Sequence, residues 1–305
     1  MQVPFEPTAF SSGGKAHLTY ELYLTNFSSN MMVLQRIEVL DADKSGAKPI
    51  NTFESGPLAA LLQPVGEQAS AERNSPYQLA AGSTVVVYLW ITIDHGTRVP
   101  KRLSHRVFTA DFSADGAVIS THHTALHVLG PPVRRTNWLA DDGPSNDQEN
   151  HHRRGILIFE GRTRISRRYA IDWLKIDNGT TFSGDATDKR SYHAYGQPVA
   201  AADGTVVTAR DGLPDNVPGH DEGFHPAVPI TPDTVAGNTI VLDLGVQEFA
   251  HYCHLQAGSL RVKVGDHVRR GQLLANIGDS GDARELPLGG TLVDFGEVNA
   301  SRLGW

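Results

Sequence analysis

The sequence has few of the features that mark a disulfide-stapled, membrane-spanning or nucleic-acid-binding protein. Cys253 is the one cysteine among 305 residues, which excludes an internal disulfide and a metal site built from several thiolates. The longest apolar run, Val85–Ile91, is far shorter than the ~20 residues of a bilayer-spanning helix, so no membrane span is expected. The chain carries 27 basic and 34 acidic residues. Its net charge of −7 gives no general attraction for a polyanion, so nucleic acid is not an expected partner.

Helical periodicity is also scarce, and strand patterns take its place. Ala16–Phe27, Val33–Leu40 and Thr84–Ile93 are rich in aromatic and β-branched residues, and turn signals such as Asp115-Gly116 separate the runs. This pattern predicts a mainly β protein in which residues 1–130 form an immunoglobulin-like β-sandwich. One short helix is expected near Pro57–Leu62.

Residues 131–154 interrupt the strand pattern. Pro131-Pro132, Gly143-Pro144 and a polar stretch that ends in His151-His152 are typical of a linker. Residues 155–305 then return to short strand patterns and are predicted to form a second all-β domain.

Two segments of the second domain share an order of turn residues and valines. They are Tyr195–Val206 and Val264–Leu274, and each is expected to fold as a β-hairpin. Between them, Leu213–Thr234 carries five prolines and is predicted to be a long loop. Such a loop either borders a functional site or is an ordinary surface insertion.

A series of short motifs runs through the second domain in a fixed order. They are Arg168-Tyr-Ala-Ile-Asp172-Trp, Tyr195-Gly-Gln-Pro-Val with Asp203-Gly-Thr-Val, Tyr252-Cys-His254-Leu-Gln, Val264-Gly-Asp-His-Val with Arg270-Gly-Gln, and Gly278-Asp-Ser-Gly281. In this order the chain resembles the lysostaphin-like (LytM-like) zinc metallopeptidases over about residues 168–281. The resemblance implies a lysostaphin-like β-sheet domain with a duplicated hybrid motif.

The same resemblance implies a function. Members of the family are zinc endopeptidases that cleave peptide crosslinks of bacterial peptidoglycan, which implies a periplasmic or extracellular location. Met1–Pro7 does not read as a secretory signal, so the location depends on the resemblance alone. In the family, zinc is held by a His and an Asp four residues apart and by the second His of a terminal His-x-His. A His in a Tyr-x-His-Leu strand assists catalysis. The resemblance therefore implies Asp172 as a metal ligand and His254 as the assisting catalytic residue.

The other ligand positions depart from the family pattern. Arg168 stands where the first ligand His is expected, and a guanidinium has no lone pair for a metal. It is expected either to bind a substrate carboxylate or to pair with Asp172. His267 is the last histidine of the chain, and the best match to the terminal motif puts Asp294 at the ligand position. The candidate substitute imidazoles are His152, His193, His220, His225 and His251, and among them His152 is favoured.

Two functions stay open on these residues. One is a metallopeptidase-like protein, related to zinc endopeptidases of peptidoglycan crosslinks, whose metal site is altered or lost; a retained zinc ion would be held by Asp172, Asp294 and His152. The other is a non-catalytic module that keeps the scaffold and binds a wall peptide or a protein partner. A biotinyl or lipoyl carrier is disfavoured because no lysine lies between Lys189 and Lys263. A serine hydrolase is also disfavoured, because the residues around Ser280 lack the Gly-x-Ser-x-Gly spacing and read as a tight turn.

Overall fold

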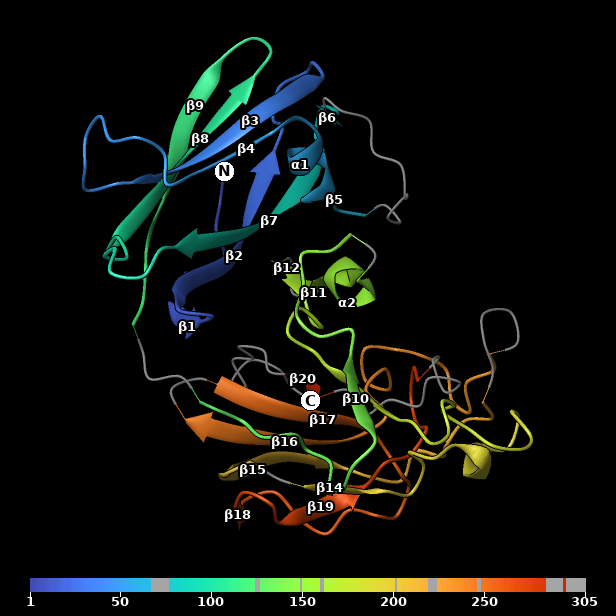
Figure 1. Cartoon of the computed structure of the whole chain (residues 1–305). Helices are drawn as coiled ribbons and strands as arrows, with labels where there is room; N and C mark the ends of the chain where they lie inside the picture. Colours follow the sequence, from blue (N-terminus) through green and yellow to red (C-terminus); the bar gives the residue numbers. More distant parts are fainter. Residues whose placement is uncertain are drawn as a thin grey trace. The chain divides into compact units, whose positions relative to one another are not determined.

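Strands dominate the architecture of the chain (Figure 1), which confirms the prediction of a mainly β protein. The structure is a computed structural model, and it describes residues 1–66, 77–123, 127–148, 150–159, 162–200, 202–218, 224–245, 248–283 and 293–294. Within these residues no helix has the length and apolar character needed to cross a membrane.

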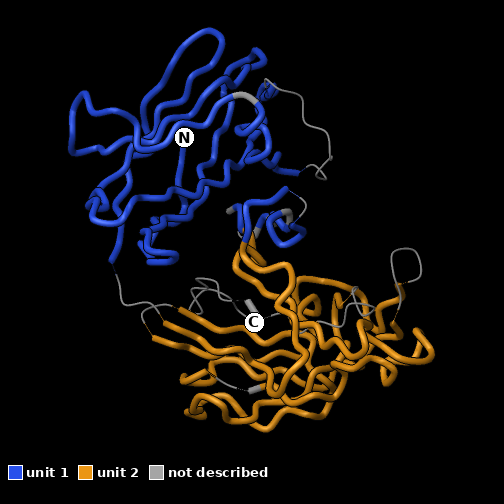
Figure 2. The backbone as a smooth tube through the Cα atoms, viewed as in Figure 1, with its two compact units in different colours: residues 1–126, 145–164 blue, residues 127–144, 165–305 orange. Residues whose placement is uncertain are grey.

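The chain divides into two compact units (Figure 2). Unit 1 consists of residues 1–126 and 145–164, and unit 2 consists of residues 127–144 and 165–305. Residues 131–154, expected as a linker, are shared between the two units and contain a strand and a short helix.

Unit 1 is built from two antiparallel sheets. The first has the order β1-β2-β7-β5, with bounds β1 Phe10–Ser12, β2 Lys15–Thr25, β7 Thr84–Ile93 and β5 Leu62–Pro64. The second has the order β4-β3-β8-β9, and β6 also pairs with β3; the bounds are β4 Asn51–Glu54, β3 Met32–Asp41, β8 Arg102–Thr109, β9 Ser113–Ser120 and β6 Tyr77–Leu79.

The two sheets of unit 1 share one hydrophobic core. Leu22 and Leu89 come from the first sheet and Ile37 and Leu103 from the second, and all four are fully buried in the same cluster. Alternation explains this in β8, where every second residue is buried. The arrangement is a two-sheet sandwich, and the immunoglobulin-like topology remains a prediction.

Short helices and a small ribbon complete unit 1. The expected helix is present as α1 (Ser55–Ala60). A second helix, α2 (His151–Arg154), lies in the stretch expected as a linker, and the Asn150 side chain caps it by accepting a hydrogen bond from the Arg153 amide at 3.1 Å. β11 (Ile156–Phe159) and β12 (Arg162–Ile165) pair with each other.

Unit 2 is organised around a five-stranded sheet. Its order is β18-β15-β16-β17-β20, with bounds β18 His267–Val268, β15 Gly204–Arg210, β16 Asn238–Gly245, β17 Glu248–Leu255 and β20 Val293–Asp294. Two further pairs are β10 (Trp138–Asp141) with β13 (Asp172–Lys175), and β14 (Pro198–Ala200) with β19 (Leu273–Asn276). A 3-10 turn, η1, spans Lys189–Ser191.

The two similar segments of unit 2 do not form two local hairpins, so that sequence-based expectation is wrong. They pair with each other instead: β14 pairs with β19, and β15 pairs with β18. Val199 and Val206 of the first segment lie in one buried cluster with Val268 and Leu274 of the second. Pairing across the segments buries all four side chains together, and this accounts for the exchange of partners.

Candidate functional site

His254 lies in a β-bulge near the end of β17. Between the pairs Asn238↔Leu255 and Ile240↔Tyr252, β17 has two residues, Cys253 and His254, where β16 has one. His254 takes a left-handed backbone conformation, with φ of 56°. A bulge turns the extra residue away from regular strand alternation, so this backbone sets the direction of the imidazole.

Three hydrogen bonds hold His254 in this conformation. Its amide donates to the Ala236 carbonyl at 2.9 Å, and its carbonyl accepts from the Gly278 amide at 3.0 Å. Its Nδ1 lies 2.8 Å from the Ser280 carbonyl oxygen. Because a carbonyl only accepts, Nδ1 carries the proton and Nε2 keeps the lone pair of the neutral ring.

Charged side chains surround His254 within unit 2. Burial lowers the pKa of its imidazole, whereas the hydrogen bond to the Ser280 carbonyl and the charges of Asp172 and Asp282 raise it, and Arg167 lowers it. The structure therefore brings Asp172 and His254, which two separate motifs single out, within electrostatic range of each other. Asp282 and Arg167 are not identifiable from the sequence, because neither belongs to a motif with a known role.

Asp172 is half-buried and opens β13, where it pairs with Asp141 of β10. Arg168 lies in the turn before this strand and is nearly buried, at 4% exposed. Its amide donates to the Ile165 carbonyl at 3.1 Å, and its guanidinium lies 5.6 Å from the centre of the Tyr169 ring. The motif Arg168–Asp172 thus forms a turn that leads into the strand carrying the carboxylate.

His152 belongs to unit 1. It lies in α2, is 1% exposed, and its ring centre is 4.1 Å from that of His151. Two adjacent imidazoles are therefore fixed on a helix that the sequence pattern does not predict.

The remaining candidates are placed by the backbone or lie elsewhere. β20 sets Asp294 opposite His251 of β17, three residues before His254. His251 is itself a poor base, because burial lowers its pKa to about 4. His193 lies beside Ser183, and its Nε2 is 3.4 Å from the serine hydroxyl. His220 falls outside the described residues.

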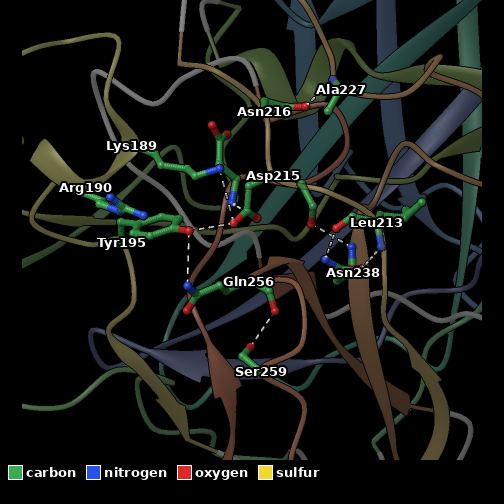
Figure 3. A network of polar contacts seen from close by, with 12 residues as sticks. Lys189, Arg190, Tyr195, Leu213, Asp215, Asn216, Ala227, Asn238, Gln256 and Ser259 are labelled. Carbon is green, nitrogen blue, oxygen red and sulfur yellow. Dashed lines mark hydrogen bonds and ion pairs between the residues drawn. The ribbon is translucent and has the colours of Figure 1, made fainter.

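The predicted long loop takes part in the same region of unit 2. Leu213 exchanges two hydrogen bonds of 2.8 Å with the Asn238 side chain, and Asn216 donates to the Gly281 carbonyl at 2.8 Å. Asp215 accepts from the Tyr195 hydroxyl at 2.7 Å, as Figure 3 shows. The beginning of this loop therefore packs on the turn that carries Ser280.

The donor types of the site can be compared with the needs of a zinc ion. A catalytic zinc takes about three protein ligands, from imidazole nitrogen, carboxylate oxygen or thiolate sulfur. Asp172 and Asp282 supply carboxylates within electrostatic range of the His254 imidazole. These carboxylate oxygens fit zinc, whereas Arg168 offers it no donor.

Comparison with known proteins gives one family match. Residues 191–295 match peptidase family M23. No curated protein matches the chain.

Several solved structures are similar to parts of the chain. A candidate M23 peptidase from Pseudomonas aeruginosa is 14% identical, with 85% of this chain and 88% of that chain covered and a TM-score of 0.26. A zinc-containing peptidase from Vibrio cholerae is 12% identical, with 92% and 77% covered and a TM-score of 0.28. A mutant catalytic domain of the prophage-encoded M23 protein EnpA from Enterococcus faecalis is 22% identical, with 43% and 97% covered and a TM-score of 0.17.

Proposed function

We propose that the chain is a zinc endopeptidase of peptidoglycan crosslinks. It carries a peptidase family M23 domain at residues 191–295, which confirms the resemblance to lysostaphin-like peptidases. Asp172 is the proposed protein ligand in unit 2, with Asp294 as the carboxylate at the terminal ligand position. Zinc bound there would polarise the scissile carbonyl and lower the pKa of a bound water.

The observation that carries this proposal is the state of His254. Its Nδ1 proton is committed to the Ser280 carbonyl, so the Nε2 lone pair is the one available for chemistry. The charge of Asp172 acts on the same ring. A base in a fixed tautomer, within electrostatic range of a carboxylate ligand, suits proton transfer to or from the atoms that react at the metal. His254 is therefore the proposed general base or acid.

Arg168 has a separate proposed role. A guanidinium binds carboxylates in a planar, bidentate fashion, which suits the free carboxylate of a wall peptide. The alternative role is to pair with Asp172, and the near burial of Arg168 favours this alternative.

Zinc content and peptide cleavage together test the proposal. The full chain is expected to retain about one zinc ion after dialysis, as a catalytic site does, and to cleave a crosslinked peptidoglycan peptide. Asp172→Ala should lose zinc, and the exposed Asp177→Ala should keep it. His254→Ala should keep zinc and lose about 10²–10⁴-fold in rate, which is typical for a general acid or base.

Other outcomes identify a different protein. If the chain binds the wall peptide but holds no zinc and cleaves nothing, it is the non-catalytic module. The presence of Arg168 where the family has a ligand histidine favours that outcome. If Asp172→Ala keeps both zinc and cleavage, the proposed site is wrong.

A further inference from the structure

The turn Gly278–Gly281 is the most tightly enclosed segment near His254. Asp279 and Ser280 are both 0% exposed. The Ser280 hydroxyl accepts from the Asn238 amide and donates to the Leu255 carbonyl, each at 2.8 Å. Gly237 approaches so closely that a Cβ there would lie 2.3 Å from the Ser280 carbonyl oxygen. The carbonyl that binds His254 therefore cannot shift without disturbing its neighbours.

Asp279 has an unusual environment within this turn. Both of its carboxylate oxygens are buried and have no hydrogen-bond partner among the described residues. Its backbone amide donates to Asp215 Oδ1 at 3.0 Å, so a second acid lies directly beside it. An unpaired buried carboxylate costs several kcal/mol, and such a group usually takes up a proton or a cation.

The neighbouring carboxylate already has its donors. Asp215 Oδ2 accepts from the Tyr195 hydroxyl at 2.7 Å and lies 3.9 Å from Lys189 Nζ, and Oδ1 takes the Asp279 amide. Figure 3 shows Tyr195 and Lys189 converging on Asp215. With two hydrogen-bond donors and an ammonium at ion-pair distance on Asp215, little oxygen is left for a metal ion. A proton on Asp279 is the simpler way to neutralise the pair.

We propose that Asp279 is held as a neutral carboxylic acid and is a positioning residue for His254, because its proton lets the turn that carries the Ser280 carbonyl stay packed against Asp215. A role of this positioning in catalysis rests on the function proposed above. The protonation of Asp279 beside Asp215 does not depend on that function.

The charges around Asp279 support this assignment. Burial raises the pKa of Asp279 to about 8, and the charge of Asp215 adds to the rise. The charge of Lys189 and the polar side chain of Asn216 act in the opposite direction. Tyr192 lies within electrostatic range of Asp279: burial raises its pKa, and a charge on Asp279 would raise it further. In the unfolded chain the ordinary aspartate pKa is 3.8. From about pH 4 to about pH 8 the native state therefore keeps a proton that the unfolded state releases, so stability falls as pH rises through this window.

Thermal unfolding of the full chain against pH tests the proposal. Asp279→Asn removes the titration and keeps the shape, so its Tm should exceed that of the native chain by at least about 4 °C at neutral pH. The difference should vanish near pH 4 and grow towards pH 8. The control variant Asp233→Asn, at an exposed position, should show the same dependence of Tm on pH as the native chain. Asp215→Asn should lower the pKa of Asp279 in the native state, because the like charge is gone. The fall in stability should then end at a lower pH than in the native chain.

An NMR measurement of His254 tests the positioning role. The Nδ1–H signal of the His254 imidazole should change in the native chain as pH passes about 8, and it should not change in Asp279→Asn. If Tm depends on pH in the same way in Asp279→Asn and in the native chain, Asp279 is not a neutral acid. If the His254 signal changes with pH in the same way in both, Asp279 does not position His254. Neither result depends on cleavage, so both measurements stay decisive for a chain without peptidase activity.

Discussion

His254 combines a left-handed backbone with a fixed imidazole. A non-glycine residue at positive φ costs of order 1–3 kcal/mol, and it persists where surrounding contacts determine it. Here the contacts are the bonds to Ala236, Gly278 and Ser280. The same contacts leave only one ring nitrogen for chemistry. The strain at this residue is thus tied to the orientation of the imidazole.

A substitution at Gly237 would test how tightly the residues around the Ser280 carbonyl are packed. Its φ is +64°, and a Cβ would lie 2.3 Å from the Ser280 carbonyl oxygen. Gly258 has a similar φ of +72° but open space around it. Gly258→Ala should cost only the left-handed strain, about 1–2 kcal/mol in the free energy of unfolding. Gly237→Ala should cost at least about 2 kcal/mol more, because backbone must move. Urea unfolding of the two full-length variants checks this, and equal losses would contradict it.

Part of the candidate site can be predicted from the sequence alone. Asp172 and His254 stand in motifs whose chemistry is known, and the structure brings them within electrostatic range. Ser280 acts through its backbone carbonyl, which no side-chain pattern reveals. Asp279 looks like a turn residue in the sequence, and only tertiary packing buries it beside Asp215.

At the scale of elements, strand positions follow from local pattern and strand partners do not. Thr84–Ile93 is predicted as a strand and forms β7, because a run of buried β-branched residues needs no partner information. The segments at Tyr195–Val206 and Val264–Leu274 predict the right strands and the wrong pairing. Pairing depends on which arrangement fills the common core, and a single segment does not contain that information.

Helix α2 escapes prediction because four residues cannot form a stable helix by propensity. Tertiary contacts of Arg153 hold it in place. Its guanidinium donates to the Asn146 carbonyl and, at 2.8 and 3.3 Å, to the carbonyls of Ala60 and Leu62. It also lies 4.5 Å from the centre of the Tyr88 ring, and the Tyr88 hydroxyl donates to the Arg153 carbonyl. This anchor fixes the helix that carries His151 and His152.

Arg153→Lys tests the anchor. Lysine keeps the charge but cannot serve several carbonyls through a planar fork or stack on the ring. The free energy of unfolding should fall by about 2–4 kcal/mol, since buried carbonyls lose their donors. Arg98→Lys, at an exposed position of unit 1, should change it by less than about 0.5 kcal/mol. Hydrogen exchange should also quicken at residues 151–154. Unchanged exchange there would show that other contacts hold α2.

At the scale of the whole molecule, the chain passes between its units after residues 126, 144 and 164. Neither unit is therefore one continuous stretch, and no single cut releases an intact unit. Each unit nevertheless has its own hydrophobic cluster, one containing Leu89 and the other containing Leu242. Cooperative unfolding follows the extent of a packed core, so the two clusters predict two unfolding units on one interlaced chain.

Calorimetry of the full-length chain can separate these two cores. Leu89 and Leu242 are both 0% exposed, and Leu→Ala at such a site costs about 2–5 kcal/mol. Leu89→Ala should lower the temperature of one transition by several degrees and leave the other in place. Leu242→Ala should do the reverse, and it alone should disturb the His254 imidazole signal, because Leu242 shares a cluster with Tyr252 and Leu255 on either side of that bulge. If either variant moved both transitions equally, the two clusters would be one cooperative unit, and the interlaced chain would be the reason.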